Sequence, residues 1–271
     1  MLINSIYEAS DFILSLYDKP IDLAIILGSG LGELADFIEN PLIIPYEKIP
    51  HFPISTIEGH QGILYIGSLE GKTILAMKGR VHYYEGYSME EITFPVRVFK
   101  NLGINQIILT NACGGIREDL DAGSIVFLED HCSLFCPSPL RGPNLNEFGP
   151  RFKDMTEVYS RRLLNVAYQA SKNINVPVSS GIYGYYPGPM FETPADIRAY
   201  KTLGCDLAGM STVPEAIIAR HSDMEILGIS LVTNKAAGLS DSLLSHQDVQ
   251  NAASKASVSL QKLVREIIKD M

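Results

Sequence analysis

The sequence has little positive charge and no long apolar run. Its 22 Lys and Arg residues are outnumbered by 31 Asp and Glu residues, so the 271-residue chain has a formal net charge of -9 at pH 7. Such an excess of negative charge disfavours nonspecific binding to nucleic acids and to anionic membrane surfaces. No apolar segment reaches the roughly 18 residues that a membrane-spanning helix needs. Residues 1–20 lack the charged start and unbroken apolar core of a signal peptide. We therefore expect a cytoplasmic protein that binds neither nucleic acids nor membranes.

Cysteine is scarce as well. Cys113, Cys132, Cys136 and Cys205 are scattered along the chain and form no CxxC pair. His131 could join Cys132 and Cys136 as a metal site, but a second pair of ligands is missing. Isolated triples of this kind rarely bind metals, and reduced thiols are the norm in cytoplasmic proteins. We expect reduced thiols that pack in the interior, and no metal.

Short aliphatic runs bounded by turn signals recur along the chain and alternate with helix patterns. Several runs are apolar at consecutive positions, which is typical of strands covered on both faces. This alternation predicts one α/β domain over residues 1–271, with a central mixed, mostly parallel twisted sheet that closes into a partial barrel and is flanked by helices. The expected strands are 22–27, 63–66, 73–77, 106–110, 124–128, 176–186 and 225–233.

Three helices have recognisable starts. A capping box that begins at Ser88 precedes a helix over 92–102, in which Pro95 is expected to produce a kink. The other starts are Thr193-Pro194 before 197–203, and Ser245 before a long final helix with an apolar stripe. Two irregular stretches complete the pattern: the Pro-, Gly- and Asn-rich segment 136–152, expected to be functional, and 236–247, expected to form a mobile lid.

Glycines separate the first expected strand from a helix that is expected to open at Glu33. The sequence there, GSGLG over residues 28–32, resembles loops that hold phosphate, because bare N–H groups and a helix N-terminus favour an anion. A dinucleotide fingerprint would need a glycine in place of Glu33, and a triphosphate loop would need a lysine and another spacing. A single free phosphate, bound by the Ser29 hydroxyl and nearby amides, is the remaining ligand. A purely structural turn is the alternative.

Further candidate anion ligands follow. Arg80 and His82 lie two residues apart, on the same side of an extended segment. Arginine offers a planar fork for phosphate, and histidine adds a donor that titrates near neutral pH. His60 lies between two glycines upstream, and the expected strand 106–110 ends in TNACGG, where N–H groups can point at a ligand beyond the sheet. A solvated arginine or a surface histidine would be the ordinary explanation of either residue alone.

Seven motifs together resemble the trimeric purine nucleoside phosphorylases, from about residue 20 to the final helix. Any one of them could arise by chance, but seven in the same order are specific. The resemblance implies reversible phosphorolysis of a purine nucleoside to the free base and (2-deoxy)ribose 1-phosphate, without metal or organic cofactor, by a homotrimer. The motifs are GSGLG (28–32), RVHYYEG (80–86), FPVRVFKNLG (94–103), TNACGG (110–115), GPMFET (188–193), GMSTVPEAIIARH (209–221) and TNK (233–235).

The resemblance also implies which residues act. His82, Glu192 and Asn234 would be catalytic, and an amide donor on the purine would stabilise the negative charge that develops on the leaving base. Phe148 would reach into the ribose site of a neighbouring subunit. The implied contacts are Ser29, His60, Arg80, His82, the Ala112 amide and Ser211 for phosphate; Tyr84, Phe148, Met210 and His246 for ribose; and Phe191, Glu192 and Asn234 for the base.

Asn234 and Glu192 bear on specificity. The similar methylthioadenosine phosphorylases have an aspartate where this chain has Asn234, so the pair favours 6-oxopurine nucleosides such as inosine and guanosine, in purine salvage. Methylthioadenosine phosphorolysis is the alternative activity, and the polar His246 opposes it. A catalytically silent nucleoside sensor is a third interpretation, opposed by the intact phosphate ligands. Two features depart from the family: Cys113 replaces a common alanine, and Tyr185 and Tyr186 are bulkier than usual.

Overall fold

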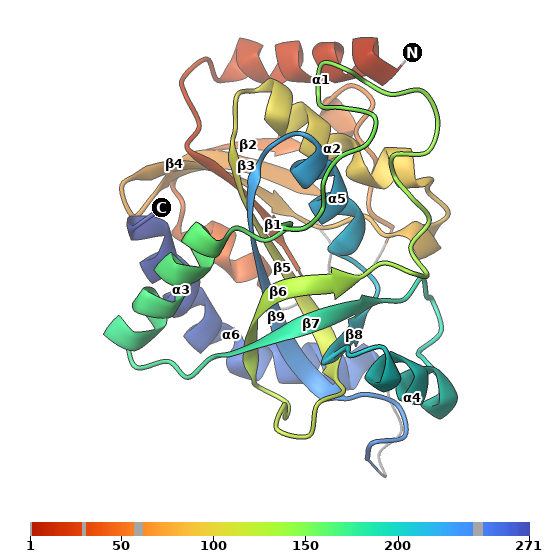
Figure 1. Cartoon of the computed structure of the whole chain (residues 1–271). Coiled ribbons are helices and arrows are strands. Elements are labelled where there is room, and N and C mark those ends of the chain that lie inside the picture. Colours follow the sequence, from red (N-terminus) through yellow and green to blue (C-terminus); the bar gives the residue numbers. More distant parts are fainter. Residues whose placement is uncertain (1, 29–30, 57–61, 241–245) are drawn as a thin grey trace.

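The strands that the structure describes form one sheet, shown with the surrounding helices in Figure 1. The computed structural model describes residues 2–28, 31–56, 62–240 and 246–271. At residues 246–250 and 253–255 it describes the backbone of the final helix but not the side chains. In the order in which they lie side by side, the strands are β2 (Glu39–Pro45), β3 (Ile63–Leu69), β4 (Lys72–Lys78), β1 (Leu23–Leu27), β5 (Gln106–Gly115), β8 (Leu207–Gly209), β7 (Ser179–Tyr185), β6 (Ile125–Cys132) and β9 (Glu225–Lys235).

The sheet is open at one end and closed at the other. Strand β9 pairs with β6 and also with β5, so β5, β8, β7, β6 and β9 form a ring, while β1, β4, β3 and β2 extend from it as an open sheet. Of the pairings that the described residues make, five are parallel and four are antiparallel. The predicted mixed, partly closed sheet is therefore confirmed.

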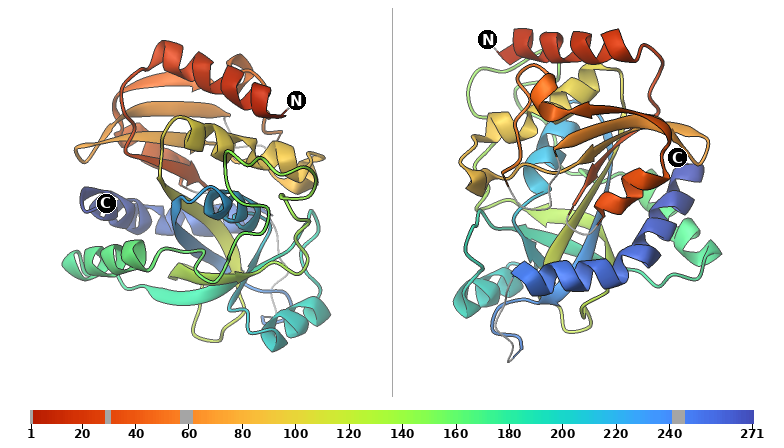
Figure 2. Two further views of the ribbon diagram at one scale, coloured as in Figure 1. Left: turned by 45° about the horizontal axis from the view of Figure 1, so that its top comes forward. Right: turned by 180° about the vertical axis from the view of Figure 1, so that it is seen from behind.

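Helices cover both faces of this sheet because its central strands are apolar on both sides. In β1, Ala24 and Ile26 pack into one cluster, while Ile25 and Leu27 pack into another. The first cluster takes in α1 (Leu2–Leu16), α2 (Met89–Asn101) and α5 (Val213–His221); the second takes in α3 (Arg161–Asn173) and α6 (His246–Lys269). Figure 2 shows α6 crossing the face opposite α2 and α5. Among the helices in the described part of the chain, none combines the length and apolarity that crossing a bilayer requires.

Two of the predicted helix starts are confirmed by their cap geometry. The Ser88 hydroxyl accepts a hydrogen bond from the Glu91 backbone N–H, and the Glu91 carboxylate accepts one from the Ser88 N–H at 2.7 Å. Thr193 and Asp196 form the same reciprocal pair before α4 (Pro194–Thr202). The final helix α6 is present as expected, whereas its predicted cap, Ser245, lies outside the described residues.

The helix predicted to open at Glu33 is short and is not an α-helix. Residues Gly32–Phe37 form a 3-10 helix, in which the Ile38 N–H bonds the Ala35 carbonyl, and strand β2 begins at Glu39. Six residues are too few to stabilise an isolated α-helix, because nucleation costs more than so few hydrogen bonds return. Strand β2 itself was not predicted: it contains two prolines, which are tolerated here because it is an edge strand.

Candidate active site

A pocket lies where the carboxyl ends of β1, β4, β5 and β9 share one edge of the sheet, next to β8. It contains about 750 Å³ of unoccupied space, part of it open to solvent. Ligands of parallel sheets bind at this edge. Nine of the predicted site residues line it: Arg80, His82, Tyr84, Ala112, Phe191, Glu192, Met210, Ser211 and Asn234.

Gly28 brings the end of β1 against β5 at the bottom of this pocket. Its N–H donates to the Thr110 hydroxyl at 2.9 Å, and that hydroxyl donates to the Ile26 carbonyl at 3.0 Å. A Cβ at position 28 would lie 2.6 Å from the Thr110 carbonyl oxygen and 2.7 Å from the Asn111 Cα. The glycine is therefore needed for close packing of the backbone, whatever ligand the loop binds. Ser29 lies outside the described residues, so its contact with phosphate stays a prediction.

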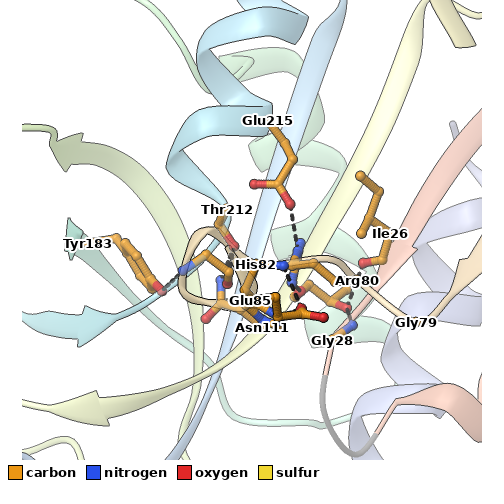
Figure 3. Close-up of polar contacts among 12 residues, drawn as sticks. Ile26, Gly28, Gly79, Arg80, His82, Glu85, Asn111, Tyr183, Thr212 and Glu215 are labelled. Carbon is orange, nitrogen blue, oxygen red and sulfur yellow. Dashed lines mark hydrogen bonds and ion pairs between the residues drawn. The ribbon is translucent and has the colours of Figure 1, made fainter. Parts of the chain in front are cut away.

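Arg80 follows β4 and is fixed by the protein (Figure 3). The Nε atom donates to Glu215 Oε1 at 2.6 Å, and Nη1 donates to the Thr110 carbonyl oxygen at 2.6 Å. Arg80 is 3% exposed. Because two of its nitrogens are held in this way, the guanidinium plane has one orientation at the pocket wall. Glu215 was not among the predicted residues.

Ser211 is held at the N-terminus of α5 by an unusual turn. Thr212 has a φ of 69°, and the Val213 N–H bonds back to the Ser211 carbonyl at 2.7 Å. Asn111 Nδ2 donates to the Thr212 hydroxyl at 2.9 Å, and the Ser211 hydroxyl lies 3.2 Å from that hydroxyl. These bonds hold a threonine in a conformation that side chains disfavour. They leave Ser211 at a helix N-terminus, where backbone N–H groups favour an anion.

His82 is oriented by Glu85, which sequence analysis did not single out. Its Nδ1 lies 3.1 Å from Glu85 Oε1, and its ring stacks on Tyr84 with centroids 4.7 Å apart. Burial acts to raise the pKa of the Glu85 carboxyl, but hydrogen bonds from His82 and Thr56 outweigh it and lower that pKa to about 2. An ionised carboxylate only accepts, so the proton between the two groups belongs to Nδ1. The spacing of three residues in RVHYYEG was the signal for this pair.

The other end of the pocket is formed by Glu192 and Asn234. Glu192 is 8% exposed, and burial raises the pKa of its carboxyl. Asn234 lies near the end of β9, where its Nδ2 donates to the Lys235 carbonyl at 2.8 Å and its Oδ1 accepts from Thr233 at 2.9 Å. Phe191 is partly exposed beside them. A buried carboxyl and a carboxamide thus lie in one pocket with an exposed aromatic face.

The register of β9 places Asn234. Along most of their length β5 and β9 pair residue by residue, and Cys113 lies opposite Val232. The next residue, Gly114, lies opposite Asn234, so Thr233 is an extra residue on β9. This is a β-bulge, and both Thr233 and Asn234 line the pocket as a result.

Met210 and Tyr84 lie together in the middle of the pocket, next to the segment after β7. A Cβ on Gly188, which has a φ of 69°, would lie 2.6 Å from the Met210 sulfur and 2.9 Å from Tyr84 Cδ1. The chain can therefore pass over these two side chains only with a glycine there. The predicted His60 lies outside the described residues, as does the side chain of His246. The predicted lid, 236–247, falls partly outside them as well.

The role predicted for Phe148 depends on a neighbouring chain and stays a prediction. The side chain is 7% exposed within its own chain, and the Arg97 guanidinium lies 5.5 Å from the centre of its ring. Within the single chain, the ring thus packs beside Arg97 of α2. Phe152, four residues further on in the same irregular region, is 91% exposed.

The cysteines behave as packing residues. Cys113 lines the pocket, but burial raises the pKa of its thiol, and the thiol donates to the Leu231 carbonyl. Cys136 points to the Pro137 carbonyl, while His131 lies 3.1 Å from the Tyr159 hydroxyl. Within the described parts of the chain, three or more His, Cys, Asp or Glu residues nowhere gather as a metal site.

These features define an enzyme pocket of a known class. The sequence profile of the phosphorylase superfamily matches residues 22–269, and the chain belongs to that superfamily. Purine nucleoside phosphorylase 1 of Bacillus subtilis (strain 168) is 47% identical over 265 residues, which cover 98% of each chain. Isoform 2 of purine nucleoside phosphorylase from Schistosoma mansoni, in a crystal structure with cytosine and ribose-1-phosphate, has a TM-score of 0.94 at 40% identity, covering 99% of this chain and 96% of that one. A crystal structure of Schistosoma mansoni purine nucleoside phosphorylase with adenosine has a TM-score of 0.94 at 36% identity, covering 99% and 98%.

Proposed function

We propose that the protein is a purine nucleoside phosphorylase that acts on 6-oxopurine nucleosides. It would convert inosine, guanosine and their 2′-deoxy forms, with inorganic phosphate, to the free base and the sugar 1-phosphate, in purine salvage. The observation that carries the proposal is a single pocket lined both by anion-binding groups and by a buried carboxyl with a carboxamide. Close relatives named for this activity support it.

At the anion end, Arg80, the Ser211 hydroxyl and the N-terminus of α5 supply the donors that a phosphate ion needs. His82 adds a ring oriented by the ionised Glu85. Phosphate bound there lies below the sugar and attacks it as the bond to the purine breaks. The sugar is cationic in character at that moment, so the negative charge of phosphate stabilises the transition state.

At the base end, Asn234 and Glu192 would bind the departing purine. A carboxamide N–H directed at N7 or O6 stabilises the negative charge that develops on the base. Ionised Glu192 accepts a hydrogen bond from N1–H, which 6-oxopurines carry and adenine lacks. Adenine would place its N1 lone pair against a buried carboxylate, and unpaired buried groups of this kind are costly.

We also propose that the active enzyme is a homotrimer in which a neighbouring chain completes the ribose end. In this proposal Phe148 reaches the ribose site of the neighbouring chain. Phe152, in the same irregular region, is 91% exposed. An exposed phenylalanine costs free energy in water, and a neighbouring chain would cover it.

The test is release of hypoxanthine from inosine with and without inorganic phosphate. We expect turnover that depends on phosphate and yields ribose 1-phosphate, with guanosine equally acceptable and adenosine much slower. Equal rates without phosphate would contradict phosphorolysis. Faster turnover of 5′-methylthioadenosine would replace the 6-oxopurine assignment with the alternative activity, and sedimentation of a fully active monomer would remove the homotrimer.

A further inference from the structure

Beside the anion end of the pocket lies a carboxylate that the proposed reaction does not require. Glu215 is 2.6 Å from Arg80, and the two side chains are 5% and 4% exposed. Like charges repel strongly in a buried site, so a carboxylate there opposes the binding of phosphate. Removing two charges from water is costly too, unless their geometry is good. Its presence needs a physical reason.

The position of Glu215 supplies the first part of that reason. It lies in the first turn of α5, three residues after Thr212, whose unusual conformation also places Ser211. The positive end of the helix stabilises a carboxylate in this turn. One local structure therefore fixes both a hydroxyl at the pocket and the partner of the pocket's arginine.

The orientation of the Arg80–Glu215 ion pair is the second reason for a carboxylate at this place. Arg80 lines the pocket, whereas Glu215 does not. Burial raises the pKa of Tyr84 and Tyr183, and the positive charge of Arg80 lowers it in both. Tyr84 lines the pocket, and Tyr183 contacts Ser211. The negative charge of Glu215 instead raises the pKa of Tyr159 and Tyr185, as burial also does. The pair is thus oriented with its positive end at the anion site.

We propose that Glu215 is a positioning residue for phosphate: it fixes the plane of the Arg80 guanidinium at the pocket and balances its charge while the site is empty. The gain in orientation outweighs the repulsion between Glu215 and the anion. Phosphate then enters a site whose arginine is already aligned, and binding does not require a flexible side chain to be ordered. This inference rests on the proposed function.

Replacing Glu215 should raise the KM for phosphate. Glu215→Gln keeps an oxygen that can accept from Arg80 Nε but removes the charge. We expect the KM for phosphate to rise about tenfold, the range for weakening one charged hydrogen bond, and the KM for inosine to stay within about twofold. If Glu215 served only as a structural countercharge, its removal would instead leave the KM for phosphate unchanged or lower it. Either of those results overturns the inference.

A matched control separates this effect from the loss of any ion pair. Glu225 pairs with Arg162 at 2.6 Å, and neither residue lines the pocket. Glu225→Gln should leave both KM values unchanged. If Glu215→Gln does not fold, Glu215→Asp decides, since it keeps the charge but shortens the reach: a raised KM for phosphate alone supports the inference, and any other pattern refutes it. An inactive native enzyme would refute the proposed function instead, so the two failures are distinguishable.

Discussion

Replacing Gly28 by alanine places a methyl group between the end of β1 and the backbone of β5. The new Cβ would lie 2.6 Å from the Thr110 carbonyl oxygen, whereas ordinary contact begins at 3.4 Å, so the strands must separate by about 0.8 Å. The obstacle is backbone, which cannot rotate away as a side chain can. Overpacking of this kind costs about 1–3 kcal/mol, and each kcal/mol corresponds to about 2–4 °C in Tm for a chain of this size.

The same separation reaches the anion site. The Thr110 carbonyl holds Arg80 Nη1, and Asn111 holds the hydroxyl of Thr212. We therefore expect Gly28→Ala to raise the KM for phosphate in addition to lowering the Tm. Both are measured, one by steady-state kinetics with inosine and the other by thermal unfolding.

Gly32, in the same glycine-rich segment, provides the control. Its Cβ would meet only the flexible side chain of Lys78, with Cε at 3.3 Å, and its backbone does not require a glycine. Gly32→Ala should leave stability and kinetics close to those of the native chain. If Gly28→Ala and Gly32→Ala behaved alike, the argument from close backbone approach would be refuted.

Three other outcomes are expected. Asn234→Ala should lower kcat for inosine by about 10²–10³ while the KM for phosphate changes little; an unchanged kcat would remove its catalytic role. Burial raises the pKa of Glu192, so on lowering the pH it should protonate earlier than an ordinary glutamate and then donate to adenine N1. The ratio of kcat/KM for adenosine to that for inosine should then rise, and it should lose this pH dependence in Glu192→Gln. Phe148→Ala should raise the KM for inosine in addition to destabilising the chain by about 3–5 kcal/mol, because the side chain is buried; an unchanged KM for inosine in the folded variant would remove its role at the ribose site.

Local signals in the sequence predicted the parts of the fold that are determined locally. The capping boxes at Ser88 and Thr193 place helix starts because each satisfies its own backbone donors. The apolar runs gave strands because a buried strand needs apolar residues on both faces. Short elements were predicted less well: β8, with three residues, was missed, and the helix expected to open at Glu33 is only the six-residue 3-10 helix Gly32–Phe37.

The site was predicted from motifs, and it was incomplete where contacts join distant segments. Arg80 was predicted, but its partner Glu215 lies 135 positions away, and no spacing in the sequence connects the two. The contact between Phe148 and Arg97 of α2 likewise joins segments that no spacing in the sequence connects.

The extra residue in β9 has a consequence for how this pocket could change. The bulge lets two successive side chains line the pocket, so deleting Thr233 would restore the regular alternation and move the carboxamide to the place of the Thr233 side chain without altering its identity. Chemical selectivity here depends on a count of residues as well as on their kind. Replacing Asn234 alone keeps the number of residues and can exchange one hydrogen-bonding pattern for another. Shortening the strand changes the position of the side chain that follows.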